Sequence, residues 1–375
     1  MTKIRNTIRL CSLLFFIISS ARFVHGQIHV ASQNDSLIQS GIELSIQHDY
    51  EGAEAIFQQM IEDEPDNPAG YFFMAATIQS KMMDFEADTW EQDFHRYIQL
   101  AIHHAKEKRA DGKKDSWSLF YRGSAQCYLA FYESRKGDYL AAVRHGLSGI
   151  SALKKVVDFQ PEFYDAYFGI GSYKYWRSQV TRYLNWLPLI ADERKEGLHM
   201  VLQAVEQGKF TRDVAMNELI WILLDAGRHE EAYFWALKGL EKFPQSRFFL
   251  WGAAKSSFAL GQYHPAANHY QQLLNSIANA RLNNHYNEYI CHVNLARCFA
   301  ELGNYAEAVD QIQIVESLSL SPDLEKKLKK QHKLVQQLKK RLYYVAGTEQ
   351  HPDSSISKNE FADKQRRQHT SQVTE

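Results

Sequence analysis

Cysteine is scarce in this chain of 375 residues, which carries only 4 of them. Apart from Cys11, the cysteines are Cys127, Cys291 and Cys298. Three cysteines are few, and their number is odd, so the sequence does not predict a disulfide framework. The last two are seven positions apart, about 10 Å along one helix, beyond the roughly 7 Å that a disulfide spans. We expect buried thiols that act as small hydrophobic side chains. A zinc site that uses His292 with its two neighbouring cysteines is the alternative, although the sequence has no CxxC pair.

Catalytic and nucleotide-binding motifs are also missing. The sequence contains no HExxH and no GxSxG pattern, and the glycine pair of "GIGSYKYW" at 169–176 falls inside an expected helix. The formal net charge of -1 gives no excess of positive charge for nucleic acid. Proline is rare as well, with 8 residues, which leaves room for long helices. We therefore expect a protein that is not an enzyme and needs no metal or cofactor.

The only long apolar run lies at the amino terminus. Basic residues open the chain, "LCSLLFFIIS" occupies 10–19, and small or short residues at Val24 and Gly26 precede Gln27. This order is typical of a cleaved secretory signal over 1–26 and predicts export to a periplasmic or secreted location. An uncleaved anchor is the alternative, but a membrane span needs about 20 apolar residues. Cleavage would leave 44 acidic against 39 basic side chains and no transmembrane segment.

A repeated spacing of glycine and alanine runs through most of the remaining sequence. Gly227 and Gly261 lie 34 residues apart, and the next glycine of the series comes after 42. An alanine stands five positions after each of them, at Ala232, Ala266 and Ala308. The apolar residues between them recur at helical spacing, so each glycine is expected to end one helix before a second begins. The segments "HDYEGAEAIF" and "RKGDYLAAVRHGL" show the same pattern near the start.

At these residues the chain resembles the tetratricopeptide repeat (TPR) proteins. The match is close at 34–67, 213–246, 247–280 and 289–322, and looser at 68–110, 115–161 and 163–209. The resemblance implies an all-α, TPR-like α-solenoid, a right-handed superhelix of about seven helix-turn-helix pairs over 27–322. The first helix of each pair is then expected to line the inner, concave face.

Two segments depart from the 34-residue unit. Residues 82–112 are predicted to form a second helix longer than the standard one, and 177–191 interrupt a repeat with an apolar insert. The central part, with Leu187-Pro188, Asp192, Arg194, Gly197 and Leu198, resembles repeat proteins of the Iml2 and TTC39 type, which implies a non-catalytic scaffold. The insert can cap the groove, contact a partner or pack in the core.

Lysine and arginine are concentrated after the last repeat. Residues 323–346 are predicted to form a basic helix whose apolar face caps the array, and 347–375 are predicted to be a disordered polar tail. The alternative role for the basic face is peripheral contact with anionic lipid or acidic protein.

The predicted function is a non-enzymatic protein–protein interaction scaffold in an exported compartment. Its concave groove would hold a peptide or helix of a partner protein, not nucleic acid. The repeat frame places eight partner-binding residues on the inner face: Tyr167, Lys174, Tyr175, Asn217, Trp221, Trp251, Lys255 and Arg297. The alternative is an enzyme or small-ligand-binding protein on the same helices, with the 177–191 insert as a lid. An open groove would favour the scaffold, and a deep closed pocket would favour the alternative.

Overall fold

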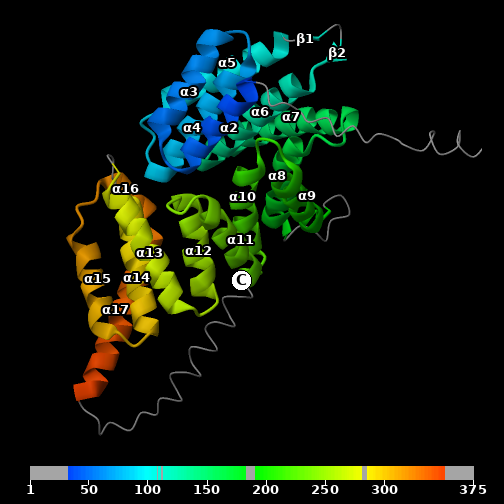
Figure 1. The fold of residues 1–375 in the computed structure, drawn as a ribbon. Helices are drawn as coiled ribbons and strands as arrows, with labels where there is room; N and C mark the ends of the chain where they lie inside the picture. Colours follow the sequence, from blue (N-terminus) through cyan, green and yellow to red (C-terminus); the bar gives the residue numbers. More distant parts are fainter. Residues whose placement is uncertain (1–32, 108, 111–112, 183–190, 281–284, 351–375) are drawn as a thin grey trace, which may run out of the picture.

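The computed structural model describes residues 33–107, 109–110, 113–182, 191–280 and 285–350. The signal-like segment 1–26 lies outside this part of the chain. The described residues form consecutive antiparallel helix pairs followed by two further helices (Figure 1). The pairs are α2 (Gln33–Ile46) with α3 (Tyr50–Asp63), α4 (Pro68–Phe85) with α5 (Glu91–Glu107), α6 (Ser116–Lys136) with α7 (Tyr139–Phe159), α8 (Tyr164–Val180) with α9 (Arg194–Gln207), α10 (Arg212–Asp225) with α11 (His229–Lys242), α12 (Arg247–Ala259) with α13 (Tyr263–Ala278), and α14 (Tyr286–Glu301) with α15 (Tyr305–Ser317).

The turns within the pairs confirm the roles predicted for the regularly spaced glycines and alanines. Gly227, Gly261 and Gly303 adopt positive φ angles of 72°, 73° and 80°, and each ends the first helix of its pair. Only glycine takes this backbone conformation without strain from a Cβ atom. The alanines five positions later, Ala232, Ala266 and Ala308, are completely buried where the two helices cross. A larger side chain at these crossings would separate the helices.

The segment 82–112 is not the single long helix predicted from the sequence. Residues 82–85 are the last turn of α4, which ends at Glu86 in the left-handed conformation with φ of 49°. Helix α5 then begins at Glu91. A pair of two-residue antiparallel strands comes after it, β1 (Arg109–Ala110) and β2 (Lys113–Lys114). The helical periodicity continues across this turn, but the left-handed residue reverses the chain there.

The carboxyl-terminal segment forms two helices, α16 (Pro322–Lys327) and α17 (Lys329–Gln350), which meet at Leu328. Helix α17 packs on α14 and α15 and buries Val335, Leu338 and Leu342 against them. It also includes 347–350, where the sequence predicts a disordered tail, and the rest of that tail lies outside the described residues. Of the 177–191 insert, the beginning extends α8 to Val180, and 183–190 fall outside the described residues.

The three remaining cysteines are free thiols. Cys291 and Cys298 are buried on the same helix, α14. Burial raises the pKa of Cys127 and of Cys298 to about 12. These thiols are therefore protonated at neutral pH and act as small hydrophobic side chains.

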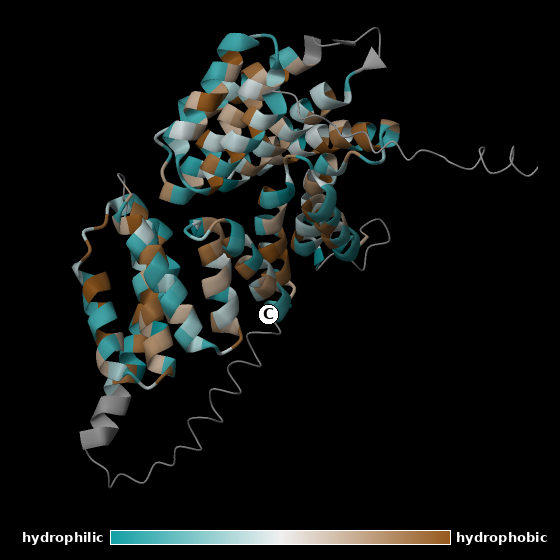
Figure 2. Cartoon of the chain, in the orientation of Figure 1, coloured by the Kyte–Doolittle hydropathy of each residue, from teal (hydrophilic) through white to brown (hydrophobic). Residues whose placement is uncertain are grey.

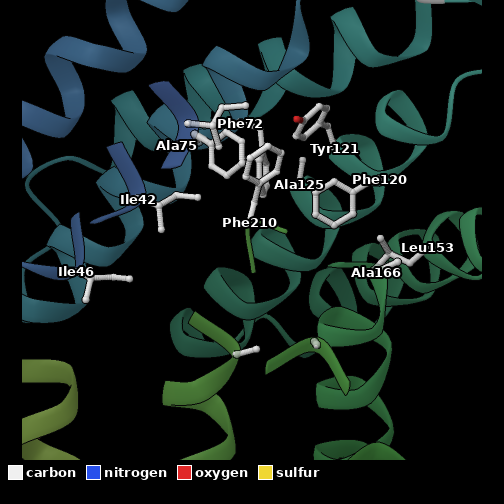
Figure 3. Close-up of a cluster of buried hydrophobic side chains, with 14 of the residues drawn as sticks. Ile42, Ile46, Phe72, Ala75, Phe120, Tyr121, Ala125, Leu153, Ala166 and Phe210 are labelled. Carbon is white, nitrogen blue, oxygen red and sulfur yellow. The ribbon is translucent and has the colours of Figure 1, made fainter. Parts of the chain in front are cut away.

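One continuous hydrophobic core extends from α2 to α12. The helices carry both hydrophobic and hydrophilic residues, as expected when each helix buries one stripe of its surface against its neighbours (Figure 2). Phe210, in the loop before α10, packs in this core against α4 and α6 (Figure 3). Its ring lies 5.2 Å from that of Trp117 and 6.0 Å from that of Phe73, between centroids.

The array follows a curved path that brings α12 and α14 back to α4 (Figure 1). The carboxyl end of α4 meets the amino ends of α12 and α14. Arg247 forms a buried ion pair with Asp84, and Asn287 donates a hydrogen bond of 2.5 Å to the carbonyl oxygen of Asp84. Lys327 donates a hydrogen bond to the carbonyl oxygen of Glu86 at 3.1 Å. These contacts join residues 163 to 241 positions apart in sequence and hold the two parts of the array together.

Candidate functional site

The first helices of consecutive pairs lie next to one another, and we refer to the face that they share as the inner face. Helix α10 contacts both α8 and α12, and side chains of α12 and α14 meet beyond them. The ammonium group of Lys255 lies 5.2 Å from the ring centroid of Trp221, across the α10–α12 boundary. The guanidinium of Arg297 lies 4.2 Å from the ring centroid of Phe258, across the α12–α14 boundary. The structure thus brings predicted site residues from three separate repeats together.

The two cations on this face have aromatic neighbours but no carboxylate partner. In the described part of the chain, neither Lys255 nor Arg297 has an acidic group within ion-pair distance, and Arg297 donates only to the amide oxygen of Asn294 at 2.9 Å. Lys255 is exposed to solvent. Surrounding protein nevertheless lowers its pKa, and repulsion from Arg297 lowers it further. An anionic group placed between them would relieve this repulsion.

Trp251 and Asn217 also lie on these helices. Trp251 is half-buried and contacts Tyr270 edge-on, with centroids 6.1 Å apart. Part of its ring therefore belongs to the core between α12 and α13. Asn217 is half-buried on α10, and its side-chain oxygen has no hydrogen-bond partner among the described residues. That oxygen atom is itself buried, so a segment bound at the surface cannot reach it.

The three site residues predicted on α8 are placed differently. Tyr175 is buried, and its hydroxyl donates to Asp225 at 2.7 Å, so it belongs to the core between α8 and α10. Lys174 forms ion pairs with Glu193 and Glu196 at the start of α9. The Tyr167 hydroxyl donates to the carbonyl oxygen of Pro161 at 2.9 Å. The repeat that contains α8 matches the 34-residue pattern only loosely, so the repeat frame places side chains less accurately on this helix.

Other residues of the inner face are not found by the repeat frame. Trp176 of α8 donates its indole N–H to Glu218 of α10 at 2.6 Å, one position from the predicted Asn217. Burial raises the pKa of Glu218, and the hydrogen bond from Trp176 opposes this. Phe258 and Asn294 are missed as well, although they lie three positions after Lys255 and three before Arg297. Helical spacing from the predicted residues could have identified both.

Further features of the described part concern metal ligands, membrane spans and hollows. No group of three His, Cys, Asp or Glu side chains there is arranged to hold a metal ion. No helix in the same part is long and apolar enough to cross a membrane. A hollow of about 180 Å³ lies among α2, α4 and α6, lined by Asp35, Asp115 and Trp117 among others. It involves none of the predicted site residues.

Comparisons with known proteins give similarity to repeat structures at low sequence identity. No protein-family model matches the sequence, and no curated protein matches it. A chain of the APC/C hetero-tetramer Cut9–Hcn1 aligns with 82% of this chain at 14% identity and a TM-score of 0.48, and the match covers only 51% of that chain. The C-terminal part of a TPR repeat-containing protein from Cytophaga hutchinsonii aligns with 78% of this chain and 99% of its own length, at 16% identity and a TM-score of 0.40. Yeast Tom70 aligns with 80% of this chain and 68% of its own length, at 11% identity and a TM-score of 0.39.

The helix pairs, their turn glycines and their crossing alanines decide the architecture. The described chain is a TPR-like solenoid. Consecutive repeats of such a solenoid pack side by side, so their first helices present a row of side chains from separate repeats. Trp221, Lys255 and Arg297 form such a row.

Proposed function

We propose that this protein is a non-catalytic scaffold that binds an extended, acidic segment of a partner protein along α10, α12 and α14. One observation carries the proposal. Lys255 and Arg297 stand side by side on the inner face with aromatic neighbours and, in the described part of the chain, no carboxylate partner. We call this set, together with Trp221, Trp251 and Phe258, the basic–aromatic face.

The chemistry of this face suits a peptide. Aromatic and arginine side chains supply most of the binding energy at protein interfaces, because they bury a large area with few rotatable bonds. A carboxylate from the partner would form charge-assisted hydrogen bonds with Lys255 and Arg297. These groups come from consecutive repeats, so an extended chain can contact them one after another.

A peptide selection followed by tryptophan replacement tests the proposal. Peptides selected from a random library on the wild-type protein should contain acidic residues next to hydrophobic ones. The double variant Trp221→Ala with Trp251→Ala should bind these peptides at least about tenfold more weakly, because a buried anchor contributes about 2 kcal/mol or more. Isothermal titration calorimetry gives the affinities, and an unchanged far-UV spectrum shows that the variant remains helical. Equal affinity for wild type and variant would refute binding at this face.

We further propose that the protein is exported after cleavage before Gln27. The support is the order of basic, apolar and small residues in the first 26 positions. Mass spectrometry of the protein from its native source should find Gln27 at the amino terminus. An exported product that begins at Met1 would contradict cleavage.

A further inference from the structure

A buried polar joint connects the first helices to the second half of the array. Arg247, the first residue of α12, donates from Nε to Oδ1 of Asp84 at 2.8 Å and pairs through Nη2 with Oδ2. The side chains of Arg247 and Asp84 are 7% and 3% exposed. Tyr50 donates its hydroxyl to the same carboxylate at 3.1 Å. Three elements, α3, α4 and α12, therefore meet at one carboxylate.

His48 completes this joint by capping α12. Its Nε2 atom accepts a hydrogen bond of 2.7 Å from the backbone N–H of Arg247, one of the amides at a helix start that have no partner within the helix. Ser246, the N-cap residue of α12, makes no side-chain capping bond. The imidazole therefore does for α12 what a serine or aspartate side chain usually does, from a position 199 residues earlier in the chain.

The backbone of His48 is strained for this purpose. His48 has φ of 67° and stands five positions before the buried Ala53. Glycine occupies the equivalent position in four other repeats: Gly137, Gly227, Gly261 and Gly303. A side chain in the left-handed region costs about 1 kcal/mol. A histidine here costs stability locally, and its ring contact with α12 compensates for it.

The hydrogen bonds define the protonation state of the ring. Because Nε2 accepts from an amide, it carries no proton, so the ring hydrogen is on Nδ1. The Nδ1 atom lies 2.9 Å from the hydroxyl oxygen of Tyr50. A second proton would place two N–H groups 2.7 Å apart and a positive charge at the start of a helix, where the dipole is unfavourable for cations. Burial lowers the pKa of His48, the carboxylate of Asp84 opposes this, and the Arg247 charge lowers it again.

The joint also positions the basic–aromatic face. Arg247 starts the helix that carries Trp251 and Lys255, and Asn287, which donates to the Asp84 carbonyl, lies at the start of the helix that carries Arg297. Asp84 thus fixes the amino ends of both α12 and α14. Release of α12 would change the distance between the two cations.

We propose that His48 is an acid-sensitive latch that holds α2–α4 against α12 at neutral pH and releases them when its ring gains a second proton. The release loosens the basic–aromatic face. This last consequence rests on the proposed function, whereas the latch itself does not.

The direction and size of the effect result from proton linkage. The closed state keeps His48 neutral, so closure is complete above the ordinary histidine pKa of 6.5 and weakens as the pH falls below it. One pH unit below that value, the closing equilibrium changes by up to about tenfold. The other groups that face the ring do not titrate in this window. Hydrogen bonds from Arg247 and His48 hold the pKa of Asp84 well below its usual range despite burial, and burial raises that of Tyr50.

Hydrogen–deuterium exchange of the full chain at pH 7.0 and pH 5.5 tests the latch without any ligand. After correction for intrinsic exchange, protection of the first turn of α12 should fall about five- to tenfold at pH 5.5. The first turn of α15, remote from His48, serves as the internal control. The variant His48→Gly has the residue of the other repeats and relieves the backbone strain, so it should fold. Its α12 should exchange rapidly at both pH values.

Each outcome decides the proposal. His264→Gln removes an exposed histidine of α13 and should retain the wild-type pH response. Equal protection of wild-type α12 at both pH values would overturn the latch, as would an unchanged response in His48→Gly. Affinity for the selected acidic peptides, measured at the same two pH values, tests the link to the basic–aromatic face. If exchange shows a pH-dependent latch but peptide affinity changes with pH equally in wild type and His48→Gly, only that link is refuted. If no peptide binds at all, the proposed function is refuted instead.

Discussion

Replacement of Asp84 by alanine should destabilise the protein by about 3–5 kcal/mol, the largest effect expected of a single substitution here. The variant would leave the Arg247 guanidinium buried without a charge partner and would remove the acceptor for Tyr50. It would also separate the beginning of α12 from α4. Denaturant unfolding followed by circular dichroism measures the loss. Because repeat arrays can unfold in parts, exchange of the α12 amides should be followed in parallel.

Two matched variants show whether the cost arises from the unpaired charge. Asp84→Met combined with Arg247→Met removes both charges and should cost less than Asp84→Ala alone, since an apolar pair can replace a buried ion pair. Arg228→Ala breaks the exposed pair with Glu231 and should change stability by less than about 1 kcal/mol. If Asp84→Ala cost no more than Arg228→Ala, the buried joint would not hold the array together.

Charge reversal on the basic–aromatic face should have the largest effect on binding. The variant Lys255→Glu with Arg297→Glu should reduce affinity for the selected acidic peptides at least about hundredfold, because it places like charges opposite each other. Both residues lack carboxylate partners in the described part of the chain, so the fold should tolerate the change. Calorimetry at two salt concentrations measures the affinity and its electrostatic part.

A compensating change in the peptide gives a stricter comparison. Peptides whose acidic residues are replaced by lysine should bind the reversed variant better than they bind wild type. The control is Lys333→Glu with Lys340→Glu, two exposed lysines of α17, which should leave affinity nearly unchanged. Loss of binding in this control, with retention in the inner-face variant, would move the binding surface to the basic capping helix.

The sequence predicts what depends on local backbone requirements. Glycine at a left-handed turn and alanine at a helix crossing are needed within each pair, so their spacing reveals the pairs and places Trp221, Lys255 and Arg297 on one face. The prediction for α8 is wrong at Tyr175, since the repeat that contains this helix matches the 34-residue pattern only loosely. Tyr175 is a core residue, and its neighbour Trp176 lies on the inner face.

The contacts of α4 with the later helices α12 and α14 could not be predicted from local sequence patterns. The pairing of Asp84 with Arg247 spans 163 residues and depends on the accumulated curvature of the stack. One signal is nevertheless present in the sequence. His48 occupies a position that four other repeats reserve for glycine, and a histidine at such a site requires a contact elsewhere to compensate for its strain.

The most direct test of the central claim is to locate a bound peptide on the molecule. A photo-crosslinking amino acid placed at position 255, on the inner face, should attach to a selected acidic peptide, and the same amino acid at Lys238, exposed on α11, should not. Mass spectrometry identifies the crosslinked residues. Attachment at position 255 that an excess of unlabelled peptide prevents is the result expected of a binding scaffold with this inner face. Attachment at Lys238 alone, or none at position 255 under conditions where the peptide binds, would contradict the account.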